Sequence, residues 1–154
     1  MRVGRALRWV SIGPVRTLGN ILWFVLAGFW LFLLYVLAGL IACVLIITIP
    51  FGVASFRIAG FVVWPFGRTA VKRSTAGVGS AIGNVLWLIL FGWELALAHL
   101  LTAAALAITI IGIPLAIANV KLIPISLWPM GREIVPIEVA QARGADFLTA
   151  DPWR

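Results

Sequence analysis

Four ionisable side chains interrupt the apolar stretches of this sequence: Arg57, Glu94, His99 and Lys121. A charged group near the centre of a lipid bilayer costs about 2.5 to 3.5 kcal/mol on insertion scales, so it needs a polar partner or a polar path. Glu94 and Lys121 could pair and fix the register of two helices. Alternatively, Arg57 and Lys121 outnumber Glu94 in a polar interior, whose net positive charge would favour anions.

Arg57 and His99 each have a second interpretation. Arg57 could stack on the ring of Trp30 as a cation–π contact, or meet Glu94 across an interface. His99 follows Glu94 by five residues, about 140° around a helix, so the two do not form one chelating face. We expect His99 to be a hydrogen-bonded helix histidine, and the alternative is a proton relay.

Other kinds of site are missing from the sequence. It has no nucleophile–base pair, no Gly-rich phosphate loop and no Cys/His cluster with zinc spacing, so we expect no enzymatic activity, no metal and no cofactor. The single cysteine, Cys43, excludes an internal disulfide and ends the string LIAC, which is similar to a lipoprotein cleavage box. The basic segment before it is too long for a signal peptide, so we expect Cys43 to be a buried apolar residue.

Composition places these residues in a membrane protein. Of 154 residues, 63% are hydrophobic and 11% are charged, whereas a soluble domain is about half apolar and one-quarter charged. The net charge of +7 comes from residues that mainly flank the apolar stretches. The flanking basic residues are Arg2, Arg5, Arg8, Arg16, Arg68, Lys72, Arg73, Arg132 and Arg143. This distribution follows the positive-inside rule, so we expect contact with anionic lipid headgroups at the cytoplasmic face and no nucleic-acid partner.

The chain contains two copies of one unit. A shift of 64 positions aligns Asn20 with Asn84 without a gap, NILWFVLAGFWLFLL with NVLWLILFGWELALA, and WPFGR with WPMGR. A tandem duplication explains this register. The predicted parts are a basic cytoplasmic N-terminal segment (1–19), a first membrane repeat (20–71), a cytoplasmic linker (72–83), a second membrane repeat (84–135) and a cytoplasmic tail (136–154).

Each unit has enough apolar residues for two crossings. A membrane helix needs roughly 20 such residues, and a single crossing per unit would put the basic linker on the outside. We therefore predict an all-α membrane protein of two tandem hairpins, with about four transmembrane or membrane-embedded helices and both termini cytoplasmic. The alternative makes 51–64 and 115–128 re-entrant or interfacial helices that break at Pro50 and Pro114. Arg57 and Lys121 would then lie near an interface.

The ends of each hairpin carry interfacial residue types. We expect the side chains near these ends to anchor the hairpins at headgroup level, namely Trp23, Trp64, Arg68, Trp87, Trp128 and Arg132. In WPxGR the proline disfavours further helix and the glycine permits a left-handed cap. Asn20 and Asn84 are expected to be N-caps. Pro50 and Pro114 are expected to kink the helices, or to open a path for ions.

The repeated pattern N-x-L-W…G…I-I-x-I-P…W-P-x-G-R, with the tail IEVAQA (Ile137 to Ala142), resembles the YccF family of small bacterial inner-membrane proteins. The likeness covers nearly the whole chain. It implies a multi-pass protein of the bacterial inner membrane with two repeats, and it implies no particular substrate or reaction. The first repeat departs from the IIGIP of the second by having Thr48 in place of the glycine.

Two function classes fit these observations. The first is a homo-oligomeric ion channel or transporter with anion preference, because four helices enclose too little volume for a water-filled path in one chain. The second is a non-catalytic scaffold or accessory subunit that supports a partner complex or envelope integrity, through a membrane-protein partner still to be identified. The channel class depends on Arg57, Lys121 and Glu94 facing a common path.

Overall fold

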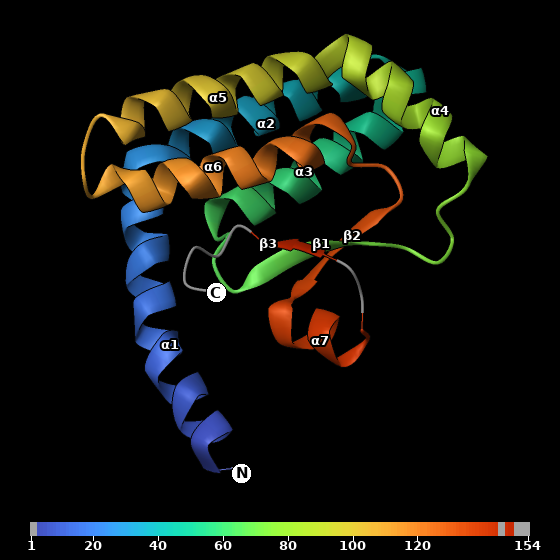
Figure 1. Cartoon of the computed structure of the whole chain (residues 1–154). Helices are drawn as coiled ribbons and strands as arrows, with labels where there is room; N and C mark the ends of the chain where they lie inside the picture. The colour runs from blue at the N-terminus through green and yellow to red at the C-terminus, as the bar shows by residue number, and fades with distance from the viewer. Residues whose placement is uncertain (1–2, 145–146, 150–154) are drawn as a thin grey trace.

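The computed structural model describes residues 3–144 and 147–149, with side chains from residue 13 to 144. It is mostly helical and contains two hairpins, as predicted, together with a small sheet that was not predicted (Figure 1). The first repeat runs through α1 (Val3–Trp23), a π-helical turn (Phe24–Gly28), α2 (Phe29–Val44), a 3₁₀ turn (Ile46–Thr48), α3 (Ile49–Val63) and β1 (Arg68–Lys72). The second runs through α4 (Val78–Trp87), a π-helical turn (Leu88–Gly92), α5 (Trp93–Ala107), α6 (Gly112–Leu127) and β2 (Arg132–Pro136), followed by α7 (Ile137–Ala142) and β3 (Phe147–Thr149).

The hairpin legs are apolar enough for a membrane. In the part of the chain that the structure describes, three helices have the length and composition to cross a membrane, Gly13–Val44, Ile46–Val63 and Val78–Ala107, and Gly112–Leu127 is a shorter apolar helix. The turns between the legs are also apolar at their surface. Ile47 is 93% exposed and Ile110 is 87% exposed, which suits contact with acyl chains better than contact with water. The predicted tandem hairpins of membrane-embedded helices are therefore confirmed.

The two prolines lie in the first turn of the second leg of each hairpin. Pro50 is the second residue of α3 and Pro114 is the third residue of α6, where a missing N–H leaves no helical hydrogen bond unmade. Neither proline kinks the middle of a helix, so the predicted packing kink is wrong. Each marks the break between two legs.

The WPxGR segments are junctions between a helix and a strand. Gly67 and Gly131 adopt positive φ angles of 92° and 74°, but each lies in a β-turn that a backbone hydrogen bond closes, from Arg68 to Pro65 and from Arg132 to Pro129. The helices end earlier, with Trp64 and Trp128 as C-caps, so the predicted left-handed helix caps are wrong. Arg68 and Arg132 then begin β1 and β2 instead of ending the repeats in a loop. The sheet has the order β2-β1-β3, and all of its pairings are antiparallel.

The hairpins run in opposite directions and are related by a pseudo-twofold axis. The ring of Phe51, at the closed end of the first hairpin, lies 6.3 Å from the ring of Trp87, at the open end of the second. In β1 and β2 the central pair is Ala70 with Ile134, which are equivalent positions of the two repeats. Figure 1 shows α2 and α5 in one layer, α3 and α6 below them, and the sheet with α7 beyond α3 and α6.

Candidate functional site in the helical layers

An asparagine closes the open end of each hairpin. The amide of Asn20 accepts a hydrogen bond from the Phe66 N–H (2.9 Å) and donates to the Phe66 carbonyl (3.0 Å). Asn84 makes the same pair of bonds with Met130, at 2.7 and 3.1 Å. Both asparagines lie inside helices and are almost fully buried, so the prediction that they are N-caps is wrong. They hold together two segments that are 46 residues apart.

A tryptophan follows each asparagine by three residues and spans the same two legs. The indole N–H of Trp23 donates to the Val62 carbonyl at 2.6 Å, and that of Trp87 donates to the Ser126 carbonyl at 2.7 Å. Both rings have 0% exposure. The prediction that Trp23 and Trp87 contact lipid headgroups is therefore wrong. Trp23 and Trp87 can lie in the core because a backbone carbonyl of the opposite leg accepts the hydrogen bond of each indole N–H. Trp64 and Trp128 are partly exposed, at 38% and 39%.

His99 lies near the pseudo-twofold axis and is fully buried. Its Nδ1 is 2.6 Å from Asn119 Oδ1, which can only accept, so Nδ1 carries the proton. Its Nε2 then accepts from the hydroxyl of Tyr35, 3.1 Å away. Ser55 donates to the Tyr35 carbonyl at 2.6 Å. We call Tyr35, Ser55, His99 and Asn119 the axial cluster.

The axial cluster joins equivalent positions of the two repeats. Tyr35 aligns with His99, and Ser55 aligns with Asn119. His99 is thus the expected hydrogen-bonded helix histidine, but the sequence analysis missed its partners Tyr35 and Asn119. The alignment that pairs the repeats could have identified Tyr35, since it sets a phenol at the position of the imidazole. Asn119 Nδ2 is buried and has no hydrogen-bond partner.

Glu94 and Lys121 do not pair, and within the described residues no ion pair joins Glu94 to Arg57. Rotation about the helix axes explains why Glu94 and Lys121 do not meet. His99 and Asn119 face each other across α5 and α6. Glu94 precedes His99 by five residues, about 140° around α5, and Lys121 follows Asn119 by two residues, about 200° around α6. Both side chains therefore point away from the contact between the two helices, and both are exposed.

Arg57 connects the two hairpins in a different way. It is half-buried on α3, and its Nη2 donates to the carbonyl of Pro129, just beyond α6, at 3.0 Å. Its Nε is buried and has no partner. The one described hydrogen bond of Arg57 is thus with the backbone. The predicted contacts of Arg57 with Glu94 and with Trp30 are not formed among the described residues.

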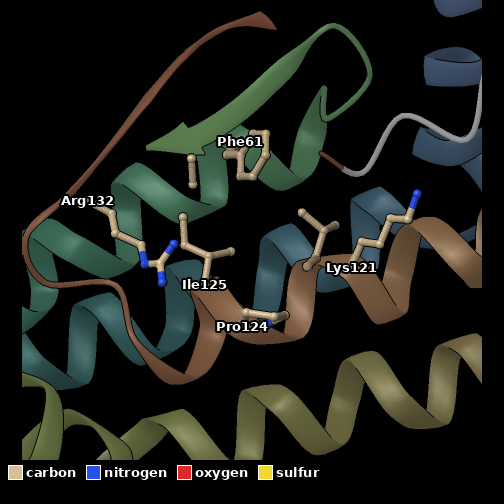
Figure 2. Close-up of a pocket in the computed structure, with 7 residues that line it drawn as sticks. Phe61, Lys121, Pro124, Ile125 and Arg132 are labelled. Atoms are coloured by element: carbon tan, nitrogen blue, oxygen red, sulfur yellow. The ribbon is translucent and has the colours of Figure 1, made fainter. Parts of the chain in front are cut away.

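Figure 2 shows the small hollow between α3, α6 and β1 that Lys121 and Arg132 line together with Phe61, Pro124 and Ile125. Five of its seven lining residues are apolar, and the Lys121 amine points away from Arg132 in this view. The four ionisable residues predicted to form a polar site are therefore dispersed: His99 is sealed at the axis, and Arg57, Glu94 and Lys121 lie on different surfaces.

The sheet side of the molecule is basic. Arg16 and Glu138 form an ion pair at 2.8 Å, and Arg143 pairs with Glu133. The described basic residues on this side are Arg16, Arg68, Lys72, Arg73, Arg132 and Arg143, against the two acids Glu133 and Glu138. Six positive charges minus two negative charges leave a net charge of +4.

Comparisons with known proteins agree with the repeated architecture. The family model YccF, described as the inner membrane component domain, matches residues 18–68 and again residues 82–132. The inner membrane protein YccF of Escherichia coli (strain K12) is 42% identical over 137 residues, which cover 83% of this chain and 93% of that protein. The protein of the same name from Shigella flexneri matches to the same extent. No solved structure matches significantly. The chain therefore belongs to the YccF family and is a multi-pass inner-membrane protein with two tandem copies of the family domain.

Proposed function

We propose that this chain is a non-conducting, non-catalytic membrane component, which supports a partner complex or the envelope through its basic sheet side. The observation that carries this proposal is the dispersal of the intramembrane polar residues. A conducting path needs polar groups that follow one another across the membrane. Arg57, Glu94 and Lys121 lie on separate surfaces, and the axial cluster has no exposed member.

The basic side supports the second half of the proposal. Its net charge of +4 lies on β1, β2, the segment after β1 and the nearby parts of α1 and α7. By the positive-inside rule this side faces the cytoplasm. There it can contact anionic headgroups and acidic surfaces of a partner protein, since basic residues near the membrane each contribute about 1 kcal/mol to contact with an anionic leaflet.

The test is ion flux in liposomes that contain the purified full chain. We expect chloride and potassium efflux at the rate of protein-free vesicles, and the same rate for Arg57→Ala and Lys121→Ala. A known chloride channel reconstituted in parallel shows that the assay responds. Chloride efflux that rises with the amount of wild-type protein and falls in either variant would overturn the proposal.

A homo-oligomeric channel with anion preference is the second candidate function. It is favoured by one observation, the position of Lys121 on the exposed surface of α6, where only a neighbouring chain could enclose it. In the flux assay this candidate gives chloride efflux that exceeds potassium efflux and depends on Lys121. The two candidates therefore give opposite results in one experiment.

A further inference from the structure

An open pocket lies beside the second WPxGR turn, between the end of β1 and the start of α4. It has a volume of about 470 Å³. Its wall includes Lys72 of β1, Ser80 of α4, and Trp128 and Arg132 of the turn. None of the described residues that line it is acidic. We call it the Lys72 pocket.

Lys72 and Arg132 bring like charges to this pocket. They are directly opposite each other at one end of the β1–β2 ladder, so they belong to the same face of the sheet, and opposed like charges repel. Within the described residues neither forms an ion pair. The neighbouring acid Glu133 belongs to the other face of β2 and pairs with Arg143. The pocket therefore has two positive charges that no acid of the described chain neutralises.

The equivalent place in the first repeat has an acid beside it. Ser80 aligns with Arg16, and each lies against the glycine of its own WPxGR turn. Arg16 pairs with Glu138 of α7, and the residue that aligns with Glu138 is Ser74. The first turn is thus covered by an internal ion pair, whereas the second has serine at both positions and an open pocket.

The start of α4 supplies further hydrogen-bond donors. The helix begins after Gly77, which provides no side-chain cap, and Gly77 and Val78 line the pocket together with Ser80. The first N–H groups of a helix have no helical acceptor and carry a partial positive charge. They add to the charges of Lys72 and Arg132, so the pocket favours an anion with several acceptor oxygens.

The surroundings of the pocket suit an amphiphile. Trp128, in the lining, is 39% exposed, and tryptophan favours the level of lipid headgroups. Val78, Ile82 and Val85 have the spacing of one helix face, and all three are exposed, so an apolar stripe runs along α4 from the pocket. A lipid with its phosphate in the pocket can lay its acyl chains on this stripe, whereas a phosphate ion leaves the stripe uncovered.

We propose that the Lys72 pocket binds the phosphate of one anionic phospholipid. Lys72 and the Ser80 hydroxyl donate to the phosphate oxygens, and Arg132, which also lines the hollow of Figure 2, adds positive potential. The proposal rests on the proposed function and deepens it, since it gives the basic sheet side one specific lipid site in the second repeat.

The test is lipid binding to the purified full chain in a neutral detergent. The chain is titrated with phosphatidylglycerol or with phosphatidylcholine that has the same acyl chains, and native mass spectrometry counts the bound lipids. We expect one phosphatidylglycerol to bind about tenfold or more tightly than phosphatidylcholine, because two basic residues contribute to its binding. Lys72→Gln and Arg132→Gln are each expected to lower its affinity about fivefold, and Lys72→Arg is expected to keep it.

Arg68→Gln is the matched control. Arg68 aligns with Arg132 and lies on the same side of the molecule, but it does not line the pocket. This variant removes one positive charge from the basic side and is expected to bind phosphatidylglycerol as the wild type does. If Arg132→Gln fails to fold, Lys72→Gln and Arg68→Gln still make the comparison, because Lys72 is exposed.

Inorganic phosphate is the second probe. We expect that it does not displace phosphatidylglycerol at an equal concentration, because it makes no contact with the apolar stripe. Displacement at that concentration would overturn the assignment of a lipid to the pocket.

Equal affinity for the two lipids, or the same loss of affinity in Arg68→Gln as in Lys72→Gln, would overturn the proposal. The flux assay gives a separate result. Chloride efflux from a protein that keeps its lipid preference rejects the non-conducting role and supports this site. No efflux and no lipid preference would overturn the site and support the non-conducting role.

Discussion

The two repeats are the same at their open ends and different in their middles. At the open ends, Asn20 and Trp23 make the same bonds to the opposite leg as Asn84 and Trp87 do, and the distances differ by at most about 0.2 Å. In the middles, Tyr35 faces His99, Ser55 aligns with Asn119, and Trp30 aligns with Glu94. The hydrogen bonds that close each hairpin are therefore the same in both repeats.

The difference separates groups that hold a hairpin from groups that make the protein asymmetric. A closing asparagine and tryptophan satisfy backbone groups inside their own repeat, so any change in them removes support from that hairpin. The axial cluster lies between the repeats, where Tyr35 of the first bonds His99 of the second. The Tyr35 phenol donates to the acceptor nitrogen of the His99 imidazole, so this bond joins two different residue types at equivalent positions. The predictions below test this division.

Removal of a closing tryptophan is expected to have the largest effect. Trp23→Ala and Trp87→Ala should each lower the free energy of unfolding by about 3 to 5 kcal/mol, because each creates a large cavity and removes an indole donor. Unfolding in mixed detergent micelles measures this change. If the open ends are equivalent, the two variants differ little from each other. Trp30→Ala, which removes an exposed ring, is the control and should stay close to wild type.

Removal of a closing asparagine is expected to have a smaller effect. Asn20→Leu leaves the Phe66 N–H and carbonyl without partners, and each such group costs about 1 to 3 kcal/mol, so we expect a loss of about 2 to 4 kcal/mol. Asn84→Leu should lose as much. A leucine variant as stable as wild type would contradict the role given to the pair of hydrogen bonds.

The smallest expected effect lies in the axial cluster. Tyr35→Phe removes one buried hydrogen bond and keeps the ring, so we expect a loss of about 1 kcal/mol. Combination with His99→Phe in a double-mutant cycle should give a coupling energy of about 0.5 to 1.5 kcal/mol. A coupling near zero would mean that the two side chains are neighbours without a stabilising bond. The same cycle between Tyr35 and Trp30 serves as the uncoupled control.

The hairpins were predictable because a tandem register is a global pattern that survives without knowledge of any contact. The positive φ angles of Gly67 and Gly131 were predictable, because glycine tolerates this conformation, but their place in a β-turn and not in a helix cap was not. The sheet was not. Its strands RTAVK and REIVP have five residues each, show no clear alternation and pair only with distant segments.

The candidate site was predicted less well than the fold. One of the two interpretations paired Glu94 with Lys121 because their positions along the hairpin match, but rotation about each helix decides where a side chain points. Trp23 and Trp87 were expected to face lipid headgroups, because a tryptophan suits both an interface and a core that contains a carbonyl acceptor. Only tertiary contacts distinguish these two environments.

The central position of β1 has a consequence for synthesis of the chain. Both neighbours of this strand, β2 and β3, follow it by about 60 residues or more. At about 5 to 20 residues per second, the ribosome needs roughly 3 to 12 s to make that stretch. During this time the first hairpin can be complete while the edges of β1 remain open. Any factor that protects the nascent chain therefore has to act at Arg68–Lys72, before the second repeat exists.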